Sequence, residues 1–507
     1  TPNYKVRVVQ SKDETEWVKV ENAHEALVSY EDFMAVKTMM KRDMRCSPDQ
    51  DEAHLFSGFL LGGEEIYEVT ELGEEERQDM NPSVPWYTTG AGTKTYMVGT
   101  LSDETIEQTV DNEIRAQYAG MEEEAAKNSL LPAILWRNSV DTAKIFCVNG
   151  DYLADISAVG ILDAMMGETY DYDIYPVINA QNLVIADLPA FVSENEEEMQ
   201  KRYSQSAQAV YQEIVWPSLT SIASRTGAKM TCMMTPQFTY TDEEEPDGEN
   251  VTYYLKRLKE EHAEAGLSAD SMEGIPLSEK IKQDQTFWQT YAPSYRFLSL
   301  YADGVKSIGE KSALPAEIRT VALGSGASGQ AVGYLNENVT LQPSTSSGIR
   351  HTFLDDFKVK CMETALGYSN ITLDFYSVTY PEGDEDSWEK MSKKIAANLG
   401  TYWKAYEAFD ATTLTESDVR IRRFLALDYK QQRAGNVITL SLEHREDAAW
   451  FLLRLHGEKV TEVAGGIFEE IEDGVYLILA EEDEVSVEVQ TGETWQYQDG
   501  GKRGDGT

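Results

Sequence analysis

The feature that most constrains the fold is an alternation between short apolar runs and helical stretches, extending from about residue 86 to about residue 490. The apolar runs end in polar or turn residues and include "KIFCVNGDYL", "DIYPVINAQNLVIADLP", "KMTCMMTPQF", "IRTVALGSG" and "ITLDFYSVTYP". Helical stretches such as 193–224 and 249–266 lie between them. Strands that alternate with helices are typical of a parallel sheet or barrel, so we predict an α/β fold.

A second pattern follows the first towards the C-terminus. The segments "NVITLSLE", "AAWFLLRLH", "GIFEEIEDGVYLILAE" and "EVSVEVQT" alternate with period two and are joined by turns. This pattern predicts a small antiparallel β domain at 434–492. The barrel with its flanking helices is then expected at 91–433. The composition of 493–507 is that of a disordered tail.

The charge of the chain bears on its partners. It contains 88 Asp and Glu against 44 Lys and Arg, a net charge of −44. Such a surface repels nucleic acid, so no nucleic-acid partner is expected. No apolar run is long enough to predict a transmembrane segment in this chain. The four cysteines form no CxxC pair, which argues against a zinc ribbon or a disulfide scaffold.

Polar residues at predicted strand ends are the first candidates for a site, because functional residues of α/β folds gather at the C-terminal ends of strands. We assign a substrate-binding role to Asn149, Asn179, Gln181, Asn182, Gln237, Ser268 and Asp270. Such amide and carboxylate groups suit a hydroxyl-rich ligand such as a sugar. The alternative is that these ends are polar simply because they meet water.

Three further residues are candidates for catalysis or metal binding. Asp151 ends an apolar run, where a carboxylate can bind a metal ion, act as a general base or merely cap a turn. His351 and Asp355 are spaced i,i+4 and would share one helix face, although a lone histidine is more often only hydrogen-bonded. We therefore assign Asp151 and His351 as candidate catalytic residues. Together with Asp355 they are the candidate ligands of one divalent metal ion.

The region from about 86 to 490 resembles a bacterial family known as domain of unknown function 2194. The resemblance rests on "GTKTYMVGTL", "LPAILWRNS", "VNGDYL", "YPVINAQNL", "YYLKRLKEEHAEAGLS" and "HTFLDDFKVKCMETALGYSNITLD". That family is similar to the deacetylase-like part of proteins from Pel-type exopolysaccharide operons. The resemblance implies a polysaccharide-deacetylase-like (β/α) barrel, an extracytoplasmic or cell-envelope location, and a polysaccharide or oligosaccharide partner.

The deacetylase motifs themselves are incomplete. Asp151 matches the second of two adjacent aspartates, but Asn149 and Gly150 do not supply the first. The HxxxH motif should follow Gly266, and it is lost there. Either His351 and an aspartate replace the usual metal ligands, or the domain binds glycan without hydrolysing it. The expected function is therefore a deacetylase of an amino-sugar exopolysaccharide, or an inactive glycan-binding or assembly protein of the same pathway.

Residues 1–63 resemble a different family, the large serine recombinases, at the end of the recombinase domain. Trp17 and the segments "ENAHEA", "EDF" and "LFSG" carry this resemblance. The catalytic serine domain and the zinc ribbon are missing, so we expect a short α/β remnant and regard a DNA-binding recombinase relative as the least favoured function. Residues 64–90 are predicted to be an acidic linker. Because the chain begins with Thr, its N-terminus is expected to be incomplete.

Overall fold

The computed structural model describes residues 87, 93–98, 133–140, 143–154, 156–191, 194–240, 246–270, 275–303, 314–324, 330–350, 353–403 and 409–491. The chain divides into two compact units, Thr1–Met44 and Arg45–Thr507, and every described residue belongs to the second. The predicted recombinase-like remnant, the acidic linker apart from Tyr87, and the C-terminal tail lie outside the described residues. The same is true of His351.

The centre of the described fold is a sheet of parallel strands. β5 is flanked by β13 on one side and by β6, β7, β8 and β9, in that order, on the other. The bounds are β5 (Ala180–Ala186), β6 (Met230–Met234), β7 (Glu264–Ser268), β8 (Ser299–Ala302), β9 (Thr320–Leu323) and β13 (Tyr368–Asp374). Every residue of β5, β6, β8 and β9 is buried, as expected for mainly apolar strands covered on both faces. The prediction of a mixed α/β fold is confirmed.

This sheet curls, because one stretch of chain joins its two sides. β11 (Thr340–Pro343) pairs with β9, and β12 (Ser346–Ser347), which follows almost at once, pairs with β13. Between them, Ser344 donates its N–H to a carbonyl of β9, while Thr345 donates to a carbonyl of β13. The parallel strands therefore follow one another around a curled half-barrel, which we call the ring, with their C-terminal ends at the same mouth. β10 (Gly333–Tyr334) and β14 (Ala411–Thr412) are short additions beside β11 and β5.

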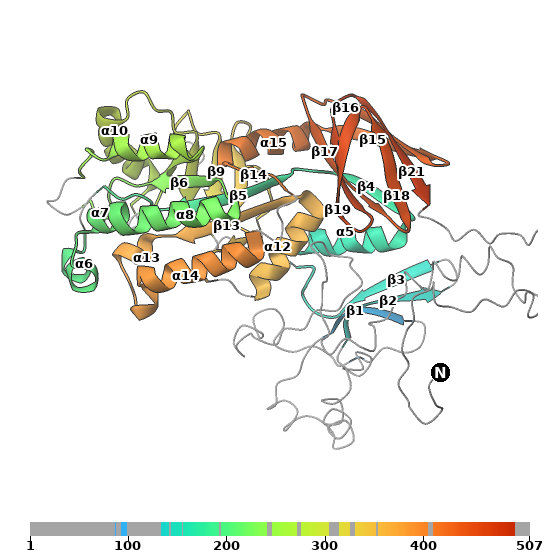
Figure 1. Cartoon of the computed structure of the whole chain (residues 1–507), viewed down its shortest axis with the longest axis horizontal. Helices are drawn as coiled ribbons and strands as arrows, with labels where there is room; N and C mark the ends of the chain where they lie inside the picture. Colours follow the sequence, from blue (N-terminus) through green and yellow to red (C-terminus); the bar gives the residue numbers. More distant parts are fainter. Residues whose placement is uncertain are drawn as a thin grey trace, which may run out of the picture. The chain divides into compact units, whose positions relative to one another are not determined.

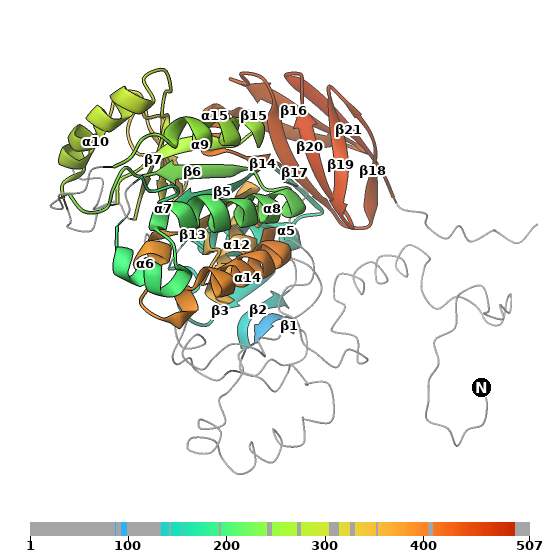
Figure 2. The ribbon, with the colours of Figure 1, turned by 60° about the vertical axis from the view of Figure 1, so that its left-hand side comes forward.

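Helices cover the outer face of the ring. α8 (Trp216–Thr226), α9 (Val251–Glu260), α10 (Leu277–Tyr291) and α14 (Trp388–Asn398) share one buried apolar cluster with the strands. Figure 2 shows α8 and α9 lying along β5 and β6. Leu183 and Ile185 of β5 belong to this outer cluster. Shorter helices at the periphery are α6 (Glu196–Tyr203), α7 (Ala207–Val210) and α13 (Tyr376–Thr379).

The helix α15 (Leu414–Ala426) closes the N-terminal mouth of the ring. Thr413 and Glu416 form a capping box that starts the helix. Three hydrogen-bonded pairs then join α15 to the first residues of β6, β7 and β11, namely Leu414 with Thr231, Thr415 with Glu264, and Asp418 with Thr340. The opposite mouth, at the C-terminal ends of the strands, has no such helix among the described residues.

Two four-stranded antiparallel sheets pack face to face at the C-terminus (Figure 1). One contains β15 (Asp428–Ala434), β16 (Val437–Glu443), β21 (Glu484–Thr491) and β18 (Glu458–Ala464). The other contains β19 (Gly466–Glu472), β20 (Val475–Ala480), β17 (Ala449–Leu455) and β4 (Tyr172–Val177). β16 alternates between buried and partly exposed residues, as its sequence suggests. Since β4 leads directly into β5, one strand from the middle of the chain ties this pair of sheets to the ring.

A separate three-stranded sheet consists of β1 (Thr93–Val98), β2 (Ala133–Val140) and β3 (Ala143–Val148). It shares a small apolar cluster with α5 (Ala158–Thr169) and α12 (Phe353–Leu366). Within the described part of the chain, no helix combines the length and apolar character needed to span a membrane.

Candidate functional site

Four aspartates stand at the C-terminal mouth of the ring. They follow β5, β7 and β8, and the fourth is the last residue of β13: Asp187, Asp270, Asp303 and Asp374. The hydroxyl group of Tyr301, in β8, shows that the four converge. Burial and then the negative charges of all four aspartates raise the pKa of Tyr301 above its usual range. We define these four residues as the rim aspartates.

Asp187 is the rim aspartate with the most unusual surroundings. It is fully buried and adopts a left-handed backbone conformation, with φ of 58°. Its Oδ1 accepts a hydrogen bond of 2.6 Å from Ser268 Oγ, whereas Oδ2 has no hydrogen-bond partner in the described structure. Burial raises the pKa of Asp187 well above its usual value, and the negative charges of Asp270 and Asp374 raise it further. These surroundings favour the protonated form of the carboxyl group, and one of its oxygens remains available to a ligand.

Asp270 stands beside this pair. Its N–H donates to Ser268 Oγ over 3.1 Å, so Ser268 links it to Asp187. Burial raises the pKa of Asp270 to about 7, with further contributions from the charges of Asp374 and Asp303. A carboxyl group with a pKa close to neutrality can donate or accept a proton at physiological pH. Asp187 and Asp270 therefore have the properties of an acid–base pair.

The remaining rim aspartates are more accessible. Asp303 and Asp374 are exposed, and Asp374 Oδ1 accepts a 2.9 Å hydrogen bond from the N–H of Tyr376. Gly324, after β9, keeps this part of the mouth open. A Cβ atom there would lie 2.6 Å from the Tyr301 hydroxyl oxygen and 2.8 Å from Asp303 Oδ1, closer than such contacts allow.

Aromatic side chains lie next to the rim aspartates. The rings of Tyr376 and Tyr380 are stacked with centroids 5.0 Å apart, and Phe238 meets both edge-on. Glu194 fixes this arrangement, because its carboxylate accepts hydrogen bonds from Tyr380 Oη and from the N–H groups of Phe238 and Thr239. Tyr376 and Tyr380 are only partly buried, so this aromatic shelf can present apolar surface to a ligand ring.

Some of the predicted site residues lie at this mouth. Ser268 ends β7 and Asp270 follows it, as described above. Gln237 lies in the segment after β6, where its carbonyl oxygen accepts a 3.1 Å hydrogen bond from Thr235 Oγ1. These three residues come from neighbouring strands of the ring, as expected for polar groups that share one edge of a parallel sheet.

Asn179, Gln181 and Asn182 lie at the opposite mouth. The apolar run that contains them is two strands, β4 and β5, with a left-handed turn at Asn179, where φ is 56°. The segment "NAQN" thus begins β5 instead of ending a strand. Asn182 is buried inside the ring, donating to Gln342 over 3.0 Å, and Gln181 is buried beside Glu363 of α12.

Asp151 and Asn149 follow β3 of the three-stranded sheet, which forms no strand pair with the ring. Asn149 Nδ2 donates to the Ala133 carbonyl over 2.9 Å. Asp355 lies in the first turn of α12, and His351 is outside the described residues. Among the residues that the structure describes, no three His, Cys, Asp or Glu side chains are spaced to hold a metal ion. The described residues therefore provide no set of ligands that fits the expected divalent ion. Because His351 lies outside the described residues, metal binding by Asp151, His351 and Asp355 stays a prediction.

Sequence reasoning missed Asp187, Asp303 and Asp374, although a signal was present. "LVIAD", "GLSAD" and "SLYAD" each place Ala-Asp at the end of a strand, and "ITLD" ends β13 with an aspartate. The repetition of an acidic residue at the end of a buried run, on four strands of one sheet, would have identified the rim aspartates.

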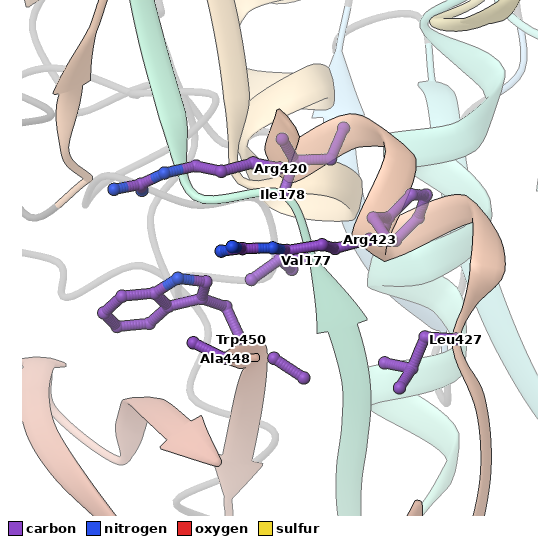
Figure 3. Close-up of a pocket in the computed structure, with 9 residues that line it drawn as sticks. Val177, Ile178, Arg420, Arg423, Leu427, Ala448 and Trp450 are labelled. Carbon is purple, nitrogen blue, oxygen red and sulfur yellow. The ribbon is translucent and has the colours of Figure 1, made fainter. Parts of the chain in front are cut away.

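A small pocket also lies near the start of β5 (Figure 3). The side chains of Arg420, Arg423 and Trp450 extend along it, and its volume is about 20 Å³, room for roughly one water molecule. Both arginines are paired, Arg420 with Asp410 and Arg423 with Asp447, each over 2.8 Å. This pocket is too small and too well neutralised to compete with the rim aspartates as a site.

Comparison with solved structures found several similar proteins, and two of them are described here. The first is a protein from Mycobacterium smegmatis provisionally named a polysaccharide deacetylase, with 8% sequence identity and a TM-score of 0.30. The match covers 48% of this chain and 90% of that one. The second, from Parabacteroides distasonis, is provisionally named a glycoside hydrolase/deacetylase. It has 9% identity and a TM-score of 0.30, and the match covers 55% of this chain and 82% of that one.

A search of the curated proteins found no match. Residues 100–273 match the model of a family described as an uncharacterised protein conserved in bacteria, DUF2194, so the predicted resemblance to that family is confirmed for this part of the chain.

Proposed function

We propose that the chain is a carbohydrate hydrolase that uses Asp187 and Asp270 as an acid–base pair. The observation that carries this proposal is the buried Asp187, whose Oδ2 has no partner in the described structure and whose pKa is raised by burial, beside an aspartate with a pKa of about 7. Two carboxyl groups with different protonation states are the usual requirement for cleaving a glycosidic bond.

In this mechanism Asp187 donates its proton to the glycosidic oxygen as the bond to the anomeric carbon breaks. Asp270, in its ionised form, removes a proton from the attacking water, whose hydroxyl group joins the anomeric carbon. Asp374 and Asp303 add negative charge near the cationic transition state. The aromatic shelf of Tyr376 and Tyr380 gives a sugar ring a flat surface beside the acid–base pair.

The substrate class follows from the family resemblance. We propose an amino-sugar exopolysaccharide of the Pel type, met at the cell envelope. Removal of N-acetyl groups is the second candidate activity, because two neighbouring aspartates can also hydrolyse an amide and because the negative charge of Asp270 raises the pKa of Asp187. A glycan-binding or assembly role without hydrolysis is the alternative from another class.

One experiment separates these activities. The purified chain is incubated with an acetylated amino-sugar polymer, and reducing ends, free acetate and polymer binding are measured in parallel. We expect reducing ends. Acetate without reducing ends would establish deacetylation, and binding with neither product would leave the binding role. If no product and no binding are found with any amino-sugar polymer, the proposal fails.

The metal prediction has its own test. Asp151→Ala, a variant at the three-stranded sheet, and treatment with a chelator should both leave the release of reducing ends unchanged, because neither touches the rim aspartates. Loss of activity in Asp151→Ala would show that Asp151 is required for hydrolysis, and loss of activity with the chelator would show that a metal ion is required.

A further inference from the structure

Lys280, in α10, is a lysine whose side chain is completely buried. Its Nζ lies 3.0 Å from Asp284 Oδ2 and donates to Tyr240 Oη over 2.9 Å and to Thr235 Oγ1 over 3.2 Å. Tyr240 Oη in turn donates to the other oxygen of Asp284. The three residues Lys280, Tyr240 and Asp284 therefore form a closed hydrogen-bonded cluster, which we call the lysine cluster.

The lysine cluster lies directly against the mouth that holds the rim aspartates. Thr235 is the residue after β6, and its N–H donates to the carbonyl oxygen of Pro189, two residues after Asp187. The charge of Lys280 acts on both Asp187 and Asp270. The charged and titratable groups that face this pair are Asp303, Asp374, Lys280, Tyr211, Tyr301 and Tyr376. The positive charge of Arg350 lowers the pKa of Asp374.

Such a lysine is not explained by stability. Taking an ammonium group out of water costs several kcal/mol, and a buried ion pair rarely outweighs an apolar pair of the same size. The neighbouring side chains on the buried face of α10, Leu277, Phe287 and Trp288, are apolar, and apolar residues would pack there equally well. A buried charge at the edge of four acidic groups therefore indicates an electrostatic role.

We propose that Lys280 is a positioning residue for the rim: its buried ammonium group keeps one of the two paired aspartates ionised while the other holds the proton. Without this positive charge, the mutual repulsion of the rim aspartates would favour protonation of both, and no base would remain. This inference deepens the proposed function and rests on it for the catalytic consequence. The charge effect itself does not depend on which substrate the chain takes.

The test measures protonation of Asp270 directly. Infrared difference spectra identify the band of its protonated carboxyl as the one lost in Asp270→Asn, and this band is followed against pH in wild type and in Lys280→Met. We expect the midpoint to rise by about one pH unit in Lys280→Met, a tenfold change in proton affinity. Lys280→Arg should restore most of the shift, and Lys282→Met, an exposed change on the same helix, should have no effect.

Lys280→Met leaves Asp284 buried without its cation and could fail to fold. In that case the double variant Lys280→Met/Asp284→Leu removes both charges, and a smaller rise in the same direction is expected, because the charge of Lys280 lowers the pKa of Asp270 and the opposite charge of Asp284 offsets part of that effect. An unchanged midpoint in a folded variant overturns the inference. A shifted midpoint in a chain without activity on glycans would support the charge effect and count only against the proposed function.

Discussion

The two mouths of the strand ring are both lined by polar residues, yet they differ in what covers them and in their charge. At the N-terminal mouth, Asn182 bonds Gln342, and Asp418 accepts from Thr340 over 2.6 Å, beneath the helix α15. Unpartnered groups occur there too, at Gln181 Nε2 and on Glu363. At the C-terminal mouth, Asp187 keeps an oxygen without a partner in the described structure and stands among three further aspartates. An unpartnered polar group is therefore a candidate for binding a ligand here because of the acidic groups around it, and not because it is unpartnered.

The largest expected effect is at Asp187. Asp187→Asn keeps the size of the side chain but removes the proton donor, so turnover should fall by about a thousandfold. Asn182→Ala is the matched control at the other mouth, and it should lower the melting temperature without comparable loss of turnover. If the two variants lost activity equally, the distinction between the mouths would be wrong.

The next effect is the pH dependence at Asp270. Because its pKa is about 7 and the proposed base must be ionised, kcat/KM should rise tenfold per pH unit below about pH 7 and level off above it. Asp270→Asn should remove this rise along with most of the activity. A profile that falls as pH increases through 7 would instead make Asp270 the acid.

A sharper comparison uses Glu363, a second buried acid whose carboxyl oxygens have no partner in the described structure. Burial raises its pKa to about 8. The folded state therefore binds a proton that the unfolded state releases above about pH 4.5, and its stabilising effect is lost as pH rises towards 8. Glu363→Gln should raise the free energy of unfolding by roughly 2 kcal/mol at pH 9 and have little effect at pH 4.

Measuring turnover tests whether Glu363, unlike Asp187, affects only the stability of the fold. Glu363 lies in α12 against the starts of β5 and β13, away from the rim aspartates, so Glu363→Gln should leave turnover unchanged at neutral pH. Denaturant unfolding at the two pH values provides the stability measurement. A loss of turnover in Glu363→Gln would show that a buried carboxyl group without a hydrogen-bond partner affects activity even when it lies away from the rim aspartates.

The smallest expected effect is at Asp418, which accepts hydrogen bonds from Thr340 and Arg422. Asp418→Asn keeps an acceptor but loses the charge, so the free energy of unfolding should fall by about 1 kcal/mol. The pH profile of activity should be unchanged. A displaced profile would mean that the two mouths are electrically coupled through the ring.

The sequence predicted the general architecture better than the site. Apolar runs such as "KMTCMM" and "ITLDF" identify buried parallel strands, because both faces of such strands are covered. At "VINAQNLVIAD" the prediction placed the polar residues at the end of a strand, whereas they lie at the start of β5. The sequence does not reveal the left-handed turn at Asn179 that divides this apolar run into two strands. Without that boundary, polar residues that begin a strand cannot be told from polar residues that end one.

Lys280 illustrates what the sequence alone could not supply. In "LSEKIKQDQ" it resembles any solvated lysine of an amphipathic helix, and Lys282, two positions later, is exposed. Only the packing of α10 against the ring decides which of the two is buried. The same holds for Asp187, whose pKa depends on neighbours at the ends of β7 and β13 and on Lys280 of α10.

The helix across the N-terminal mouth has a consequence for long substrates. Because α15 covers that mouth, the proposed function would not allow a polymer to pass through the ring. A polymer substrate would instead lie across the C-terminal mouth and leave sideways, so the proposed enzyme would act at internal positions of the polymer as well as at its ends.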